Sequence, residues 1–142
     1  MPAVDSRFAR RYQSPSGNPF GVLRPMLGVR LVDGETVTPR ILALLDSGAD
    51  GSTFHVDVAR LLGVDTAGCQ SRRVLGVGGA VSVLVCPIEL EIEGRRFAAD
   101  VNFVTDPSPR SLALLGRQDV FEQFRIGFDQ RNLTVLLEPY EQ

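Results

Sequence analysis

The sequence predicts an all-β protein with a closed or sandwich-like barrel, and three observations support this fold class. Short runs of apolar and β-branched residues recur along most of the 142 residues. Glycine-containing dipeptides such as Asp33-Gly34 and Glu93-Gly94 separate several of these runs, as expected of strands joined by tight turns. Only residues 55–62 and 118–124 have helix-like patterns. Many short strands with one or two small helices are typical of all-β barrels.

The chain divides into an arm and one domain. Residues 1–22 mix Arg, Ser, Pro, Gly and Asn without periodicity, so we expect a flexible arm, or one that orders only against a partner. Residues 23–142 are expected to form a single domain. With 44% hydrophobic residues, a chain of this length buries about two-thirds of its unfolded surface.

The elements are expected in the following order. Pro39 weakens the first half of the strand predicted at residues 36–46, and we expect this half at the edge of a sheet. Gly63 is a suitable stop for the first helix, and Pro107 and Pro109 mark a loop. Strands are predicted at residues 26–32, 36–46, 71–77, 81–92 and 95–104, the first helix at 55–62, and a further apolar run at 112–115.

Charge and hydropathy exclude several classes of function. The net charge is −2, and the basic residues form no block beyond Arg7, Arg10 and Arg11, so we expect no nucleic-acid partner. No run reaches the ~18 apolar residues of a membrane span, and no membrane association is expected. A cytoplasmic location is therefore expected.

Cysteine and histidine usage gives no sign of a metal site or cofactor. Cys69 and Cys86 are the two cysteines, and two free thiols in a reducing compartment are favoured over a disulfide. His55 is the single histidine. A serine-hydrolase reading from Ser47 and His55 is disfavoured, because no Gly-x-Ser-x-Gly motif accompanies them. We therefore expect no metal and no cofactor.

The first candidate site follows an apolar run at residues 41–45. Asp46, Ser47 and Gly48 form a turn directly after it, so a carboxylate leaves a buried strand at a point where its environment can tune its ionisation. Gly48 lets the backbone fold closely, and the Ser47 hydroxyl can tie the loop to a neighbouring backbone or to a second copy. The alternative is an ordinary Asp-Ser-Gly turn that closes a hairpin.

A second apolar run, at residues 112–115, also ends in a glycine, Gly116, which Arg117 follows. We expect its loop to pack against the Asp46 loop. The two motifs together resemble those of the retropepsin-like aspartic proteases, in which hydrophobic-Asp-Ser/Thr-Gly-Ala-Asp supplies the catalytic acid and hydrophobic-hydrophobic-Gly-Arg lies beside it. The resemblance, closest to bacterial members, extends over roughly residues 23–137.

Residues 73–85 resemble the flap of that family, a glycine-tipped hairpin that closes over bound peptide. Gly76, Val77, Gly78 and Gly79 would form its tip, with backbone amides that reach substrate carbonyls directly or through water. The alternative is a simple hairpin turn. Residues 124–129 and 133–137 are similar to the closing strands of bacterial members. The resemblance implies a retropepsin-like closed barrel with a flap hairpin and one or two short helices.

The resemblance also implies an aspartic endopeptidase, which needs two carboxylates that share one proton. The chain has one Asp-Ser-Gly, so a homodimer would pair Asp46 with Asp46 of a second copy. Catalysis is assigned to Asp46, Ser47 and Gly48, and peptide binding to Ala49 and Asp50 together with the flap residues.

Structural support is assigned to Gly116, which lets the two loops approach, and to Arg117. The resemblance pairs Arg117 with Asp50 behind the catalytic loop; the alternative is two exposed charges that never meet. Two alternatives to the homodimeric enzyme remain open. One is a catalytically weak protease-like module for dimerisation or peptide binding, and the other is a heterodimer with a different chain.

Overall fold

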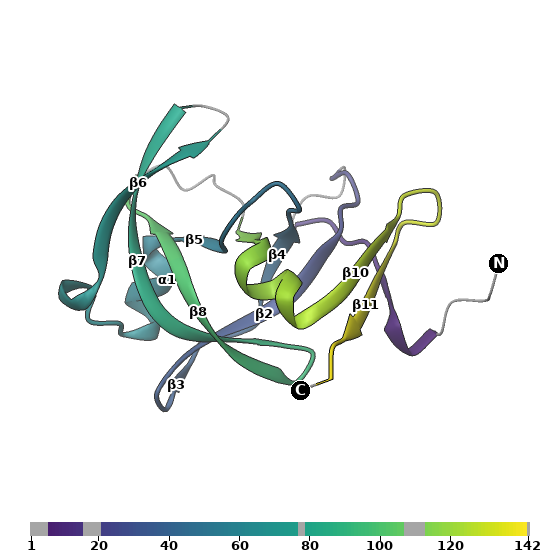
Figure 1. Ribbon diagram of the computed structural model, residues 1–142, viewed down its shortest axis with the longest axis horizontal. Helices are drawn as coiled ribbons and strands as arrows, with labels where there is room; N and C mark the ends of the chain where they lie inside the picture. Colours follow the sequence, from purple (N-terminus) through teal and green to yellow (C-terminus); the bar gives the residue numbers. More distant parts are fainter. Residues whose placement is uncertain (1–5, 16–20, 77–78, 107–112, 142) are drawn as a thin grey trace.

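The computed structural model of the chain describes residues 6–15, 21–76, 79–106 and 113–141 (Figure 1). The protein is predominantly β, which confirms the prediction of an all-β protein. Within the described part, no helix is long and apolar enough to cross a membrane. The strands are β1 (Ala9–Arg11), β2 (Met26–Asp33), β3 (Thr36–Val37), β4 (Ile41–Leu45), β5 (Thr53–His55), β6 (Gln70–Gly76), β7 (Gly79–Ile92), β8 (Arg95–Val104), β9 (Leu114–Leu115), β10 (Phe124–Asp129) and β11 (Thr134–Pro139). The helical elements are η1 (Ser6–Phe8), α1 (Val56–Leu62), η2 (Thr66–Gly68) and η3 (Arg117–Phe121), the last with π-helical geometry.

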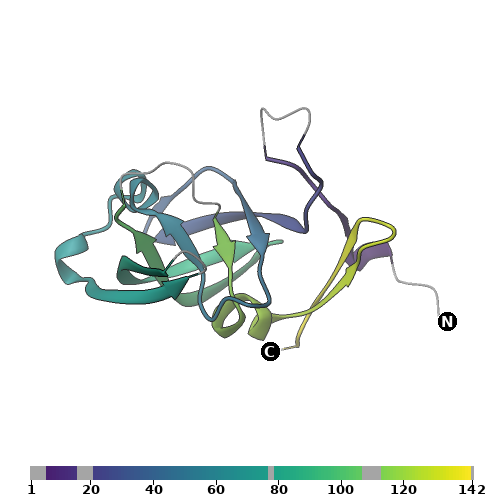
Figure 2. The ribbon, with the colours of Figure 1, turned by 90° about the horizontal axis from the view of Figure 1, so that it is seen from above.

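The larger sheet has the strand order β3-β2-β4-β9-β5-β8-β7-β6. Strand β2 also pairs with β7, from Arg30↔Glu91 to Val32↔Glu89, so the sheet curls back on itself (Figure 2). Its inner face carries the core, where Phe54, Phe103 and Leu90 are almost fully buried. Removal of this apolar surface from water is the main driving force for the fold.

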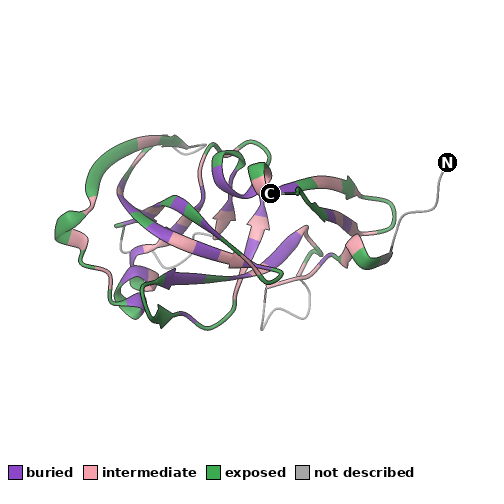
Figure 3. Ribbon diagram, turned by 60° about the horizontal axis from the view of Figure 1, so that its bottom comes forward, coloured by how far each residue is buried: buried purple, intermediate pink, exposed green. Residues whose placement is uncertain are grey.

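The smaller sheet has the order β1-β11-β10 and extends to one side of the larger sheet (Figures 1 and 2). Its strand β1 comes from the segment expected to be an arm. Ala9 is opposite Leu136, and Tyr12, only 6% exposed, belongs to the core. Residues 9–12 are therefore ordered against the chain's own C-terminal strand rather than against a partner. Buried residues run through both sheets (purple in Figure 3).

Helix α1 has nearly the predicted boundaries, whereas the single strand predicted at 36–46 is two strands. Helix α1 has His55 as its N-cap and ends at Gly63 with φ +76°, a left-handed conformation that glycine adopts without steric cost. The strand predicted at 36–46 is divided into β3 and β4, with Pro39 in the break. The first part, β3, lies at the edge of the sheet as expected.

The expectation of two free thiols is wrong, because Cys69 and Cys86 form a disulfide. Gln70 is paired with Val85 at the start of the β6–β7 hairpin, so continuing this register by one residue places Cys69 opposite Cys86. Their Cα atoms are 4.8 Å apart, within the range that a disulfide spans. The bond therefore closes the base of the hairpin, and a loop of this size stabilises a fold by about 3 kcal/mol.

Candidate active site

The Asp46 loop and the Gly116 loop begin at the ends of two parallel strands. Strands β4 and β9 are paired through Leu44↔Leu114 and Leu45↔Leu115. Because they run in parallel, the loops that follow them leave the sheet at the same edge. The Asp46 N–H donates to the Leu115 carbonyl at 3.0 Å, so the two candidate loops start side by side.

The Asp46 carboxylate is oriented by its own loop. The Gly48 N–H donates to Asp46 Oδ1 at 2.9 Å, and the Ala49 N–H donates to the Asp46 carbonyl at 3.1 Å. Asp46 is partly exposed, and its Oδ2 makes no hydrogen bond to another described residue. The Ser47 hydroxyl, also exposed, makes none within the described residues either. One carboxylate oxygen is thus fixed while the other is available.

Backbone contacts lock the two loops together, as the sequence predicted. The Arg117 N–H donates to the Ala49 carbonyl at 3.0 Å, and the Gln118 N–H donates to the Asp50 carbonyl at 2.8 Å. A Cβ atom at Gly116 would lie 2.4 Å from the Gly51 carbonyl carbon and oxygen. Only glycine fits this approach without a backbone shift.

A buried polar network joins the same two loops, and it was not predicted. The Ser52 hydroxyl donates to Asp119 Oδ1 at 2.7 Å and accepts from the Gly116 N–H at 3.0 Å. Asp119 also accepts from the N–H groups of Ser52 at 3.2 Å and Val120 at 2.7 Å. Ser52 is fully buried and Asp119 is 7% exposed. In the sequence, the one signal of this network is that Asp119 directly precedes the apolar residues Val120 and Phe121.

Asp50 and Arg117 do form an ion pair, with Arg117 Nη2 2.5 Å from Asp50 Oδ1. The pair lies on the surface of the single chain, where the side chains are 55% exposed for Arg117 and 74% exposed for Asp50. The single chain therefore contains the pair that the resemblance implies but does not enclose it. Exposed ion pairs contribute ~0–1 kcal/mol, because water and salt screen them.

The predicted flap is a hairpin of β6 and β7, which projects from the body of the protein (Figure 1). Its last described pair is Gly76↔Gly79, and the predicted tip residues Val77 and Gly78 lie outside the described residues. Gly79 has φ +112°, a backbone conformation that residues other than glycine rarely adopt. Leu75, just before the tip, is 90% exposed.

Other candidate chemistry is absent from the described part of the chain. His55 caps α1, where its Nδ1 accepts from the Asp57 N–H, and its Nε2 lies 2.9 Å from the Asp106 carbonyl oxygen; neither nitrogen faces Ser47. No group of three His, Cys, Asp or Glu side chains that could hold a metal ion occurs among the described residues. Three clefts lined by described residues lie away from Asp46, which lines none of the three.

Comparisons with known proteins do not assign the chain to a family. No protein-family model matches the chain, and no curated protein matches it. The motifs and the geometry of the two loops are therefore the support for a function of this chain.

Proposed function

We propose that this protein is a retropepsin-like aspartic endopeptidase that acts as a homodimer. The observation that carries the proposal is the position of Asp46 at the end of a buried strand, beside the Gly116 loop at the end of a parallel strand. The additional pairing of β2 with β7 joins distant strands of the larger sheet. This pairing supports a closed barrel as the architecture of the proposed peptidase.

In this mechanism two Asp46 carboxyls share one proton. The ionised Asp46 takes a proton from water as the water oxygen attacks the scissile carbonyl carbon, and the protonated Asp46 donates a hydrogen bond to the carbonyl oxygen. The tetrahedral intermediate then collapses as the first Asp46 gives the proton it took from water to the leaving amide nitrogen, which leaves the pair again with one shared proton. The Gly48 N–H holds Oδ1 of each carboxylate, so Oδ2 remains for water or for the second Asp46.

The proposed second acid comes from another copy, because nearby acids of the same chain are engaged. Asp50 pairs with Arg117, and Asp119 is buried against Ser52. A two-fold dimer supplies the missing carboxylate by symmetry. It would also complete the peptide cleft between the two copies. Peptide contacts are proposed for Ala49, Asp50, Gly76, Val77, Gly78 and Gly79.

The alternative is a protease-like module that binds peptide or dimerises without appreciable cleavage. The exposed Leu75 on the flap would suit peptide binding or dimerisation alike. A different chain as the partner is the other alternative. For location, the Cys69–Cys86 disulfide favours an oxidising compartment over the expected cytoplasm, because disulfides are rare where glutathione keeps thiols reduced.

A peptide-library assay of the full chain tests the proposal. We expect wild type to cleave with a bell-shaped pH profile on the acid side of neutrality, because both carboxyls of a close pair cannot ionise together. Asp46→Asn should lose at least about a hundredfold in rate and remain folded. Asp33→Asn, which changes an exposed acid at the end of β2, should retain activity.

Four outcomes contradict the homodimeric enzyme. Cleavage that survives Asp46→Asn, or that rises steadily to pH 9, excludes an Asp46 pair. Full activity of a monomer, measured by sedimentation beside the rate, excludes a shared site. Binding of peptides without cleavage by wild type favours the binding module.

A further inference from the structure

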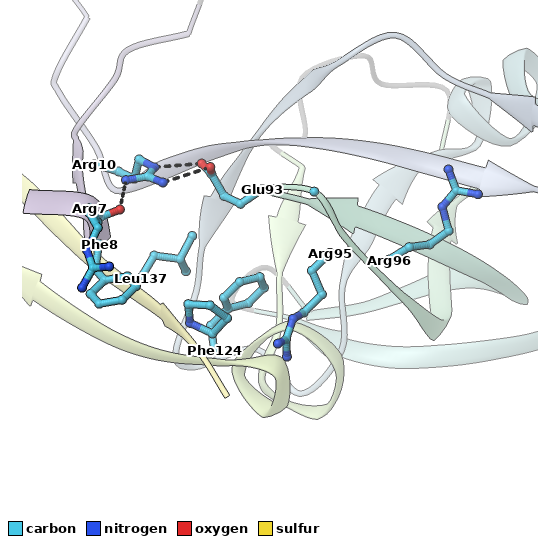
Figure 4. Close-up of a pocket in the computed structure, with 10 residues that line it drawn as sticks. Arg7, Phe8, Arg10, Glu93, Arg95, Arg96, Phe124 and Leu137 are labelled. Atoms are coloured by element: carbon cyan, nitrogen blue, oxygen red, sulfur yellow. Dashed lines mark hydrogen bonds and ion pairs between the residues drawn. The ribbon is translucent and has the colours of Figure 1, made fainter. Parts of the chain in front are cut away.

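A cleft away from Asp46 concentrates positive charge. It has a volume of about 480 Å³ and lies between the smaller sheet and the turn that joins β7 to β8 (Figure 4). Phe8, Phe124 and Leu137 provide its apolar lining. A second cleft of about 280 Å³ shares Glu93 and Gly94 with it. The two together are called the arginine cleft.

Arginines outnumber acids in this cleft. Among the described residues, six arginines and two glutamates line it, whereas the whole chain has a net charge of −2. The arginines are Arg7, Arg10, Arg30, Arg40, Arg95 and Arg96, and the glutamates are Glu91 and Glu93. Charge of one sign gathered in a concave surface raises the local concentration of oppositely charged ligands.

The two glutamates are already paired. Arg10 donates to both oxygens of Glu93, at 3.0 and 3.1 Å, as Figure 4 shows. Arg96 donates to Glu91 at 2.9 Å. The Arg10 hydrogen bonds, together with the charges of Arg10 and Arg40, lower the pKa of Glu93, so this carboxylate is ionised at neutral pH. Neither glutamate is therefore available to neutralise a further arginine at short range.

Three guanidinium groups make no direct salt bridge to a described carboxylate, although Arg30 is opposite Glu91 in the β2–β7 pairing and Arg40 is near enough to Glu93 for its charge to act on that carboxylate. Arg95 donates to the carbonyls of Gln123 and Tyr140 and lies over the Phe124 ring at 5.7 Å, but none of these partners carries a full charge. Arg30 and Arg40 are exposed and form no ion pair or hydrogen bond with a described carboxylate. A ligand that carries several anionic groups would complete these contacts.

We propose that the arginine cleft binds an acidic peptide segment that contains an aromatic or other large apolar side chain. The peptide carboxylates would contact Arg30, Arg40 and Arg95, since the guanidinium fork matches a carboxylate with two parallel hydrogen bonds. The apolar side chain would lie against Phe8 in the larger cleft. This lining favours a peptide over inorganic phosphate or a nucleic-acid backbone, neither of which has an apolar group to place there.

Glu93 occupies an unusual backbone position in the turn at the centre of the cleft. Glu93 has φ +52° and Gly94 has φ +76°, and hairpin turns with two positive φ values strongly prefer Asn, Asp or Gly at the first position. Glutamate at that position reaches across to Arg10. The contact fixes one wall of the arginine cleft and leaves the cations on its other walls available.

Binding is tested with a fluorescent peptide of sequence Glu-Asp-Phe-Glu-Glu, measured by anisotropy on full-chain Asp46→Asn so that the probe is not cleaved. Replacing Arg30 and Arg40 together by Gln should raise Kd at least about tenfold, the effect of losing one charge-assisted hydrogen bond. The matched control replaces Arg72 and Arg73 by Gln. These exposed residues of β6 lie near the other end of β7 and should change Kd less than about twofold.

Two altered probes test the chemistry of the ligand. A Gln-Asn-Phe-Gln-Gln probe should lose binding, and a Glu-Asp-Ala-Glu-Glu probe should bind more weakly. The proposal is overturned by an absence of saturable binding, by equal losses in the two double variants, or by equal binding of all three peptides. Displacement of the probe by an oligothymidylate or by inorganic phosphate at lower concentration than unlabelled peptide would instead make this a site for phosphate anions. Because Asp46 takes no part, failure here leaves the proposed peptidase untouched, and loss of the peptidase leaves this binding intact.

Discussion

Besides the backbone hydrogen bonds, two links that involve side chains join the Asp46 loop to the Gly116 loop, and they differ in burial. The link between Ser52 and Asp119 is enclosed, with 0% and 7% of each residue exposed. The link between Asp50 and Arg117 lies in water, with at least half of each side chain exposed. A buried donor that loses its acceptor has no water to replace it, whereas an exposed charge does. In the single chain, we therefore infer that Asp119 rather than Arg117 holds the two loops together.

The largest expected effect is that of Asp119→Ala. It removes the acceptor for three donors, the N–H and O–H of Ser52 and the N–H of Val120. We expect a loss of roughly 3 kcal/mol in the free energy of unfolding. Urea denaturation measures it. Asp119→Asn keeps one oxygen acceptor and should lose clearly less; equal stability of wild type and Asp119→Ala would mean that the network contributes nothing to the fold.

A smaller effect is expected from Arg117→Ala. The pair with Asp50 is exposed, so the loss should stay below about 1 kcal/mol and shrink further at high salt. The measurement is urea denaturation of the dilute protein at two salt concentrations. A loss of several kcal/mol that appears only at concentrations where the protein dimerises would have a different cause. It would mean that a second copy covers this pair and makes it a buried link as well.

Local rules made part of this site predictable. An apolar run before Asp46 and before Gly116 indicated two strand ends, and the structure places these ends side by side. Glycine geometry gave the end of α1 at Gly63 and the close approach at Gly116. Each of these features depends on a few neighbouring residues.

The missed features depend on residues far apart in the chain. Ser52 and Asp119 are separated by 67 positions, and only the folded arrangement of the two loops shows that they meet. The Cys69–Cys86 disulfide follows from the register of β6 on β7, which residue spacing does not determine. The exposure of Arg117 likewise depends on what covers it, and a sequence pattern cannot distinguish one subunit from two.

The pair of Arg10 and Glu93 gives an intermediate case, because each side chain is 34% exposed. Its hydrogen bonds lower the pKa of Glu93 below the ordinary value of 4.5, so the unfolded chain binds more protons than the folded chain in mild acid. The stability that the pair contributes is therefore present above about pH 4.5 and is lost as the pH falls through the folded pKa. The pKa of Arg10 is raised from an already alkaline value, so this residue adds no change in that range.

Glu93→Gln tests this case with the smallest expected effect. The variant should be less stable than wild type by ~0.2–1 kcal/mol at pH 7, and the difference should shrink toward zero as Glu93 becomes protonated in the wild type. Urea midpoints at pH 7, 5 and 3 measure it. Glutamine keeps the side-chain length and must adopt the same positive φ, so backbone strain is matched in the two proteins. A difference that is undiminished at pH 3 would mean that side-chain packing, and not the charge of Glu93, ties the smaller sheet to the β7–β8 turn.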